Sequence, residues 1–477
     1  MKPLIKIVRI LATLIAVLCG GVIAFWLLWL IPNLFDERLA PAAAALLAPR
    51  SDPLPDNDNL YVAFVGFSAP SGRSMLEVGE EEVEAFNRVA DRLMTDPAVA
   101  TAYYSSSRAN RLTFKGNIQA WGWVTSSLWS TAKSHRAEIA ALVAANQELY
   151  RRYLALHQLR GYFDSARPGA SGPWPNVSPD VLKLFLADAA VRLHTGTPAQ
   201  KDAALADLQA DVRMWQAVLD GYGGLFSKVI AAISLHADFL LLGDMVTDPD
   251  FDPAPFGDRL MTLLTPFALQ DWKIGAAYRW EMLNTAPLYK AIARVDVTMR
   301  APGTDRAPWW QRVDDRLSAQ FFKLNATENL QAERIQRLSA LANGDPGNFA
   351  ERRAIFRMWQ ERRYLTNSWA SYYNPVGKTL LAIVPPNEDN YAARVYDVAA
   401  FQRLVFLAYQ IRLRCIGSQD VAAFMQQHPA WATHPIDAKP FYWDPVNGEL
   451  GVLPVGKNTQ KTRFSLKLVE FSHCPRN

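Results

Sequence analysis

The stretch ILATLIAVLCGGVIAFWLLWLI, residues 10–31, decides how this chain is organised. It carries no charge, and its 22 residues are enough for a helix to cross the ~30 Å hydrocarbon core of a bilayer. Lys2, Lys6 and Arg9 precede it. Positive flanks stay on the cytoplasmic side of a membrane. We therefore expect residues 1–9 to form a cytoplasmic tail, residues 10–31 a transmembrane signal anchor, and the bulk of the chain to be exported.

Three other interpretations of this segment fit it less well. A cleaved signal peptide has an apolar core of about 7–15 residues, shorter than this run, although cleavage near Leu39-Ala40-Pro41 remains an alternative. A lipoprotein site at Cys19 would need a small residue where Leu18 stands. No pilin-type leader junction opens the segment. The prediction is a single-pass protein of the bacterial inner membrane with a periplasmic bulk, and the lipid bilayer is its first partner.

Composition narrows the class of protein. Half of the 477 residues are hydrophobic, which excludes a disordered chain. The mean hydropathy is only −0.05 and there is one long uncharged apolar run, which excludes a multi-span transporter. The net charge is +4, and basic residues come in scattered pairs without a run of five. Since phosphate binding needs concentrated positive charge, we predict no binding of nucleic acid.

Hydrophobic periodicity divides the exported part of the chain. Residues 32–59 are rich in Pro and Ala and predict a linker. Residues 60–390 predict a mostly helical periplasmic domain, because apolar residues recur every three or four positions, for example over 132–160. Residues 391–477 predict a helix, over 391–414, followed by a small β-sheet. The predicted fold class is therefore mainly α with a small β element.

Two segments carry strand patterns. The run LYVAFVGF, residues 60–67, is continuously apolar and bounded by turn residues, which indicates a buried strand. Near the C-terminus, Asn447-Gly448 lies between two short apolar runs and indicates a hairpin with a tight turn. Apolar and polar residues then alternate over 464–468, as in a further strand.

The three cysteines bear on metal binding and on the compartment. Cys19 lies in the anchor, whereas Cys415 and Cys474 lie near the C-terminus. A structural metal site needs about four ligands at short spacings, and no CxxC motif is present. In an oxidising periplasm the two exported cysteines are expected to pair, so we predict a Cys415–Cys474 disulfide, with two free thiols as the alternative.

Motifs for catalysis or cofactor binding are incomplete. Residues 451–457 have the spacing of a phosphate-binding loop, but Asn458 replaces the Ser/Thr that would hold magnesium. The segment GFSAP, residues 66–70, lacks the second Gly of a serine-hydrolase elbow. The seven His residues include no HExxH motif and no helical i, i+4 pair. We therefore predict no catalytic residues, no metal ligands and no cofactor.

One pair of charged residues stands inside an otherwise apolar helical pattern. Arg394 and Asp397 are separated by three positions in YAARVYDVAAF, residues 391–401. This spacing places them on one helix face and predicts a structural ion pair.

Four segments carry a resemblance to known envelope proteins: the anchor, LYVAFVGFSAP (60–70), ANQELYRRYLAL (145–156), and the run from RVYDVAAFQRLVFLAYQIR to HPIDAKPFYWDP (394–445). Together they resemble a loose group of uncharacterised inner-membrane-anchored periplasmic proteins of Gram-negative bacteria. The end of the chain is also similar to the C-terminal layout of major pseudopilins, which is a helix, a Pro-containing crossing and a small hairpin sheet. No catalytic residues accompany either resemblance.

These observations favour a membrane-anchored periplasmic binding or scaffolding protein of the bacterial cell envelope, non-catalytic and with an envelope protein as its partner. One alternative is an envelope hydrolase or transferase with a dispersed active site. Another is an immunity protein against a periplasmic toxin. Converging His and acidic groups in a deep pocket would favour the enzyme, whereas an apolar or aromatic patch would favour the binding protein.

Overall fold

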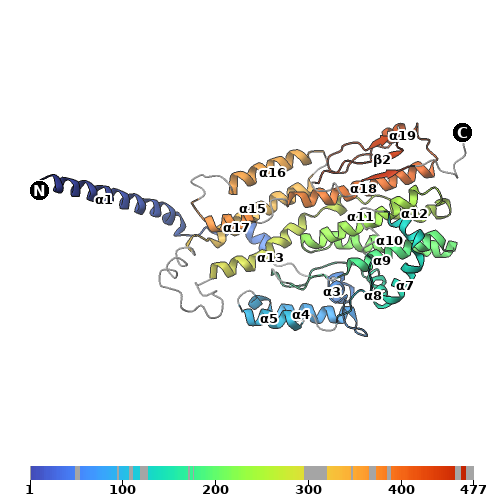
Figure 1. Ribbon diagram of the computed structural model, residues 1–477, viewed down its shortest axis with the longest axis horizontal. Helices are drawn as coiled ribbons and strands as arrows, with labels where there is room; N and C mark the ends of the chain where they lie inside the picture. The colour runs from blue at the N-terminus through green and yellow to red at the C-terminus, as the bar shows by residue number, and fades with distance from the viewer. Residues whose placement is uncertain are drawn as a thin grey trace. The chain divides into compact units, whose positions relative to one another are not determined.

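The computed structural model describes most of the chain, namely residues 2–48, 54–93, 96–106, 111–118, 127–169, 172–175, 177–294, 320–344, 347–364, 372–383, 388–456 and 464–468. In these residues the protein is mainly helical, with one three-stranded antiparallel sheet near the C-terminus (Figure 1). The predicted fold class is confirmed at this level.

The chain forms two compact units, each made of segments that are separated in the sequence. The first unit comprises Met1–Ala48, Met282–Gln336 and Ile355–Pro386, and we call it the anchor unit because it contains the predicted anchor. The main unit comprises Pro49–Glu281, Arg337–Ala354 and Asn387–Asn477. The predicted division into contiguous domains, 60–390 and 391–477, does not follow these units.

The anchor unit is built from helices that lie far apart in the sequence. It contains α1 (Lys2–Leu30), η1 (Ile31–Asn33), α2 (Pro41–Leu47) and α17 (Pro375–Ile383). It also contains parts of three helices whose other residues belong to the main unit: α13 (Gly275–Arg294), α15 (Leu324–Asn343) and α16 (Phe349–Tyr364).

The remaining elements belong to the main unit. Its longer helices are α4 (Met75–Leu93), α5 (Pro97–Ser106), α7 (Arg136–Ala145), α8 (Gln147–Leu156), α9 (Pro179–Thr195), α10 (Pro198–Asp220), α11 (Leu225–Thr247) and α18 (Asp389–Leu413). Its shorter ones are η2 (Asp56–Asp58), α3 (Leu60–Val65), α6 (Leu128–Ser134), η4 (Ala254–Phe256), α12 (Gly257–Leu264), η5 (Leu269–Trp272) and α19 (Val421–Gln427).

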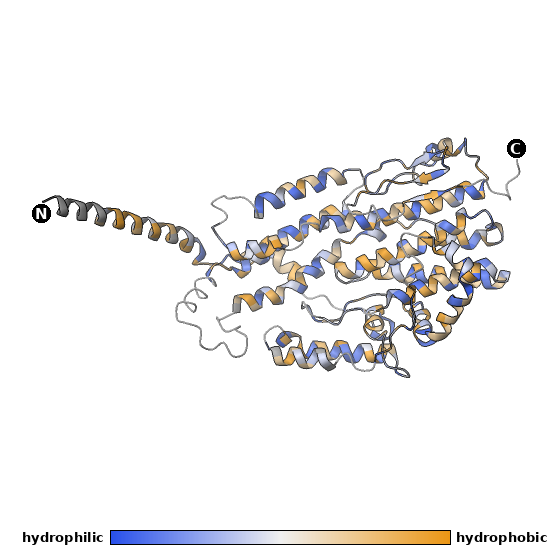
Figure 2. Cartoon of the chain, in the orientation of Figure 1, coloured by the Kyte–Doolittle hydropathy of each residue, from blue (hydrophilic) through white to orange (hydrophobic). Residues whose placement is uncertain are grey.

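The core of the main unit forms around α11. This helix packs along α10 on one side and α18 on another, and the three lie side by side (Figure 1). Among the residues searched, α11 is the one helix long and apolar enough to cross a membrane, and 83% of its apolar window is buried inside the protein. That burial identifies α11 as a core helix. Hydrophobic residues recur along the length of α11, as the orange colouring in Figure 2 shows.

The C-terminal hairpin is confirmed. Strands β1 (Tyr442–Asp444), β2 (Glu449–Gly451) and β3 (Ser465–Lys467) pair in sequence order. The turn contains four residues instead of the tight two-residue turn expected at Asn447-Gly448. Asp444 Oδ1 accepts hydrogen bonds from the backbone amides of Val446 (3.0 Å) and Asn447 (3.2 Å), and this local bonding fixes the longer turn.

Two sequence predictions for the main unit are wrong in detail. The run predicted as a strand over 60–67 begins with helix α3, whose first turn is capped by Asn59: its side chain accepts from Tyr61 N at 3.0 Å. A fully buried helix and a fully buried strand share the same continuous apolar pattern. The helix predicted over 132–160 is divided at Asn146, whose side chain bonds to the backbone of Lys115.

Candidate functional site

The C-terminal end of α1 is fixed by one buried asparagine. Asn33 Nδ2 donates to the carbonyl of Trp29 (2.7 Å) and to the carbonyl of Tyr372 (2.6 Å). Its Oδ1 accepts from the backbone amide of Asn374 at 2.8 Å. Because Asn33 is fully buried, these three bonds satisfy groups that would otherwise be costly to desolvate. The C-terminal end of α1 is thereby joined to the loop that precedes α17.

A second buried asparagine continues this network into α15 and α17. Asn374 has a positive φ of 53°, a conformation that asparagine tolerates better than most residues. Its Oδ1 accepts from the amides of Lys323 (2.9 Å) and Gly377 (3.2 Å), and its Nδ2 donates to Thr327 Oγ1 (2.9 Å). The first turns of α15 and α17 are therefore held against each other.

The residues after η1 cap α15. Asp36 accepts from the amides of Asn325 (2.8 Å) and Ala326 (3.1 Å), which places a carboxylate at the N-terminus of that helix. Asn329, one turn further along, accepts from the backbone amide of Ala40 at 2.7 Å. We call the side chains of Asn33, Asp36, Asn329 and Asn374 the clamp.

The clamp changes the interpretation of residues 32–59. The first part of this segment is bonded to α15, and α2 (Pro41–Leu47) follows where a linker is predicted. Pro at the first helical position and the following Ala and Leu residues favour that helix. The end of α1 is therefore attached directly to folded structure.

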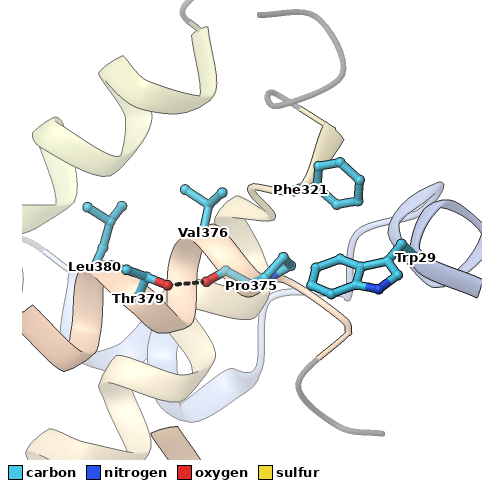
Figure 3. Close-up of a pocket in the computed structure, with 6 residues that line it drawn as sticks. All are labelled: Trp29, Phe321, Pro375, Val376, Thr379 and Leu380. Carbon is cyan, nitrogen blue, oxygen red and sulfur yellow. Dashed lines mark hydrogen bonds between the residues drawn. The ribbon is translucent and has the colours of Figure 1, made fainter. Parts of the chain in front are cut away.

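An apolar pocket lies beside the end of α1. It has a volume of about 360 Å³ and is lined almost wholly by apolar atoms of Trp29, Phe321, Pro375, Val376, Thr379 and Leu380 (Figure 3). The indole ring of Trp29 forms one wall and meets the rings of Phe321 and Tyr372 edge to face, with centroids 6.1 and 5.0 Å apart. The residues of α17 form the opposite wall.

The wall formed by α17 is supported from behind by a hydrophobic cluster. Its buried members are Tyr289, Phe322, Leu330 and Leu381, and Val376 and Leu380 pack against it. The pocket is therefore backed by packed side chains, which hold it open in a fixed shape.

Charged groups surround these elements. Burial lowers the pKa of Lys378, which lies on α17, and the nearby Arg363 lowers it further, whereas Glu37 raises it. Burial also lowers the pKa of Lys323, and Asp36 opposes this shift. Burial together with Glu37 and Asp36 raises the pKa of Tyr373 to about 12. The elements around the apolar pocket thus carry both cationic and anionic groups.

The strongest cluster of titratable groups lies in the main unit and is closed. Asp211 Oδ1 accepts from Tyr153 Oη at 2.7 Å and lies 2.9 Å from His157 Nε2. Burial, followed by the charge of Asp211, raises the pKa of Asp238 well above its ordinary value. Asp211 and Asp238 are fully buried, so a substrate has no access to them and the cluster belongs to the core.

The ion pair of Arg394 with Asp397 stays a prediction, and the structure gives Asp397 further contacts. Its Oδ1 lies 3.2 Å from His434 Nε2, and its two oxygens accept from the amides of Val455 (2.7 Å) and Gly456 (2.9 Å). Asp397 therefore fixes a C-terminal loop against α18, a structural role reached through partners distant in the sequence.

The described residues bear only in part on two further predictions, the disulfide and the absence of metal ligands. Cys474 lies outside them, so the Cys415–Cys474 disulfide stays a prediction. Within the residues searched, no group of three His, Cys, Asp or Glu side chains could hold a metal ion.

The two walls of the pocket differ in how far the sequence indicates them. Trp29 stands near the end of the apolar run 10–31, where aromatic residues prefer to lie if that run spans a membrane. Phe321 and α17 lie about 290 and 350 residues after Trp29, and neither carries a recognisable motif. The dipeptide Asn374-Pro375 does carry a helix-start pattern, with Pro at the first position of α17.

No protein-family model, no curated protein sequence and no solved structure matches this chain. Its function is therefore inferred from the geometry of α1, the clamp and the pocket.

Proposed function

We propose that this protein is a single-span, non-catalytic binding or scaffolding protein of the bacterial cell envelope. Residues 10–31 hold it in the inner membrane, and the rest of the chain lies in the periplasm. The observation that carries this proposal is the exposure of α1: Leu18 is 71% exposed and Phe25 is 56% exposed. Apolar side chains exposed along a helix need another environment, and a bilayer supplies it.

The length of α1 agrees with this role. Its 29 residues give a helix of about 43 Å at 1.5 Å per residue, longer than the ~30 Å hydrocarbon core. The apolar surface also continues past the helix, because Phe35 is 78% exposed. The clamp begins at Asn33, where such a span would leave the hydrocarbon. The orientation follows from the cationic residues before the span, which favour a cytoplasmic N-terminus.

Binding is better supported than catalysis. The titratable cluster around Asp211 is closed, whereas the pocket at Trp29 is open and apolar. The clamp holds that pocket at the base of the anchor. A protein built in this way can present a folded surface to an envelope partner at a fixed distance from the membrane.

A paired reporter experiment tests the proposal. Alkaline phosphatase and green fluorescent protein are each fused after Asn477, and membranes are extracted with alkaline carbonate. We expect phosphatase activity, no fluorescence, and protein that stays in the pellet. A deletion of residues 2–31 serves as the control, and its product should be soluble after expression in the cytoplasm. Fluorescence from the full-length fusion, or its release by carbonate, would contradict the proposal.

A further inference from the structure

The pocket lies at the C-terminal end of an apolar stripe on α1. Leu18, Val22, Phe25 and Trp29 are spaced by four, three and four positions, which places them on one side of the helix. The first three are exposed, and the last forms a wall of the pocket. The stripe and the pocket together make one apolar surface that runs from the anchor onto the folded anchor unit.

The lining of the pocket indicates the chemistry of its occupant. Almost no polar atom faces the pocket, so a group that enters it must have no hydrogen-bonding requirement of its own. A hydrocarbon chain meets this requirement.

The surroundings of the stripe identify the source of such a chain. If α1 spans the bilayer, Leu18 and Val22 face acyl chains, and Trp29 lies near the boundary between hydrocarbon and headgroups. The apolar lining contributed by Phe321 and by α17 faces Trp29 at this level (Figure 3). An acyl chain that follows the stripe towards its own headgroup meets the pocket before it reaches the polar clamp.

We infer that the pocket binds one acyl chain of a bilayer lipid by the part nearest its headgroup, with the rest of the chain lying along Leu18, Val22 and Phe25. This inference rests on the proposed function, since it needs α1 to be in the membrane. The bound lipid covers the apolar wall of α17 and seals the anchor unit against the membrane surface.

Photolabelling of the full-length protein tests this inference. The protein is reconstituted into vesicles of phosphatidylethanolamine and phosphatidylglycerol that contain a phospholipid with a diazirine near the carbonyl end of one acyl chain. Labelled peptides are then identified by mass spectrometry. We expect label on α1 and also on the peptide that carries residues 375–380.

Thr379 provides the variant that fills the pocket. It lines the pocket, is exposed, and its Oγ1 donates to the carbonyl of Pro375 at 2.9 Å. Thr379→Trp should place a ring in the mouth without disturbing the cluster behind α17. We expect labelling of α17 to fall about tenfold, the factor that corresponds to ~1.4 kcal/mol of binding, while labelling of α1 is unchanged.

Thr262 provides the matched control. It is also exposed and helical, its Oγ1 donates to the carbonyl of Asp258 at 2.9 Å, and it lines a polar hollow formed by α12 and its neighbours. Thr262→Trp should leave both labels at their original levels.

The two labels separate failure of the inference from failure of the proposed function. Label on α1 without label on α17 would overturn the acyl-chain site and leave the membrane anchor intact. Equal labelling of α17 in the wild type and in Thr379→Trp would also overturn the site. Absence of label from α1 would contradict the proposed function itself.

Discussion

Two long apolar helices, α1 and α11, have opposite environments. α11 is enclosed by α10 and α18, whereas the described apolar side chains of α1 are exposed over most of its length. An apolar composition alone does not indicate a membrane span, because the enclosed helix α11 is itself long and apolar enough to cross a bilayer. The difference lies in charged residues and histidine: α11 contains Lys228, His236, Asp238 and Asp244, whereas residues 10–31 contain no Asp, Glu, Lys, Arg or His.

Each helix suits only one environment because of those residues. Lys228 Nζ donates to the carbonyls of Val218 (2.7 Å) and Gly221 at the C-terminal end of α10, where a cation is favoured. Burial lowers the pKa of His236 to about 4 and keeps it neutral against Phe401. The protein core thus gives Lys228 carbonyl acceptors and holds His236 in its neutral form, whereas either group would be costly in lipid. An apolar helix with ionisable residues at core-facing positions is therefore typical of a protein interior.

The largest expected effect comes from placing charge in each helix. Leu18→Arg with Val22→Arg should abolish membrane retention, because each arginine costs about 3 kcal/mol in the middle of a span. The thermal unfolding of the main unit should not change. Leu241→Arg in α11 should instead prevent folding, because Leu241 is buried. Carbonate extraction and circular dichroism measure the two outcomes. Membrane retention by the α1 double variant would contradict the assignment of α1 to lipid and of α11 to the protein core.

The predicted disulfide tests whether the chain around the end of α18 lies in an oxidising compartment. A Cys415–Cys474 bond would close a loop of about 59 residues and contribute roughly 4 kcal/mol to the free energy of unfolding. Cys415→Ser should lower the free energy of unfolding by about this amount under non-reducing conditions, and reductant should lower that of the wild type similarly. Cys19→Ser is the matched control and should have no effect. Two alkylatable thiols at Cys415 and Cys474 in unreduced protein would contradict the prediction.

Local patterns predicted more of this molecule than long-range contacts could. The helix over 391–414 and the hairpin at Asn447-Gly448 follow from spacing within a few residues, and both are present. The clamp could not be predicted, because Asn33 and Asn374 are 341 positions apart. The partners of Asp397 are similarly remote: His434 is 37 positions away. Periodicity indicates which residues turn inward, but not which segments they meet there.

The buried aspartate of α11 gives a pH-dependent test. The folded chain keeps the proton of Asp238 at pH values where the unfolded chain, with a pKa near 3.9, has lost it. The free energy of unfolding should therefore fall as pH rises above about 4, by up to roughly 1.4 kcal/mol per pH unit until the folded pKa is passed.

Asp238→Asn should remove this dependence, because an amide can donate permanently to Asp211. Unfolding midpoints should be measured between pH 4 and pH 8. Those of the wild type and Asp238→Asn should converge at low pH, and the variant should have the higher midpoint at high pH. Asp211→Asn is the contrasting control: it weakens the acceptor used by Tyr153 and should destabilise the protein at every pH. Parallel pH profiles for the wild type and Asp238→Asn would show that Asp238 is ionised in the folded state.

The smallest expected effect concerns the clamp at the end of α1. Asn33→Ala removes three hydrogen bonds and takes from the buried amide of Asn374 its side-chain acceptor, at a cost of about 1–3 kcal/mol. Hydrogen exchange should increase in α17 and leave α11 unchanged, since the clamp lies in the anchor unit. Asn33→Asp keeps the acceptor for Asn374 and should show a smaller increase. Equal exchange in all three proteins would mean that α17 is held without the anchor, and that α1 tethers the folded chain without positioning it.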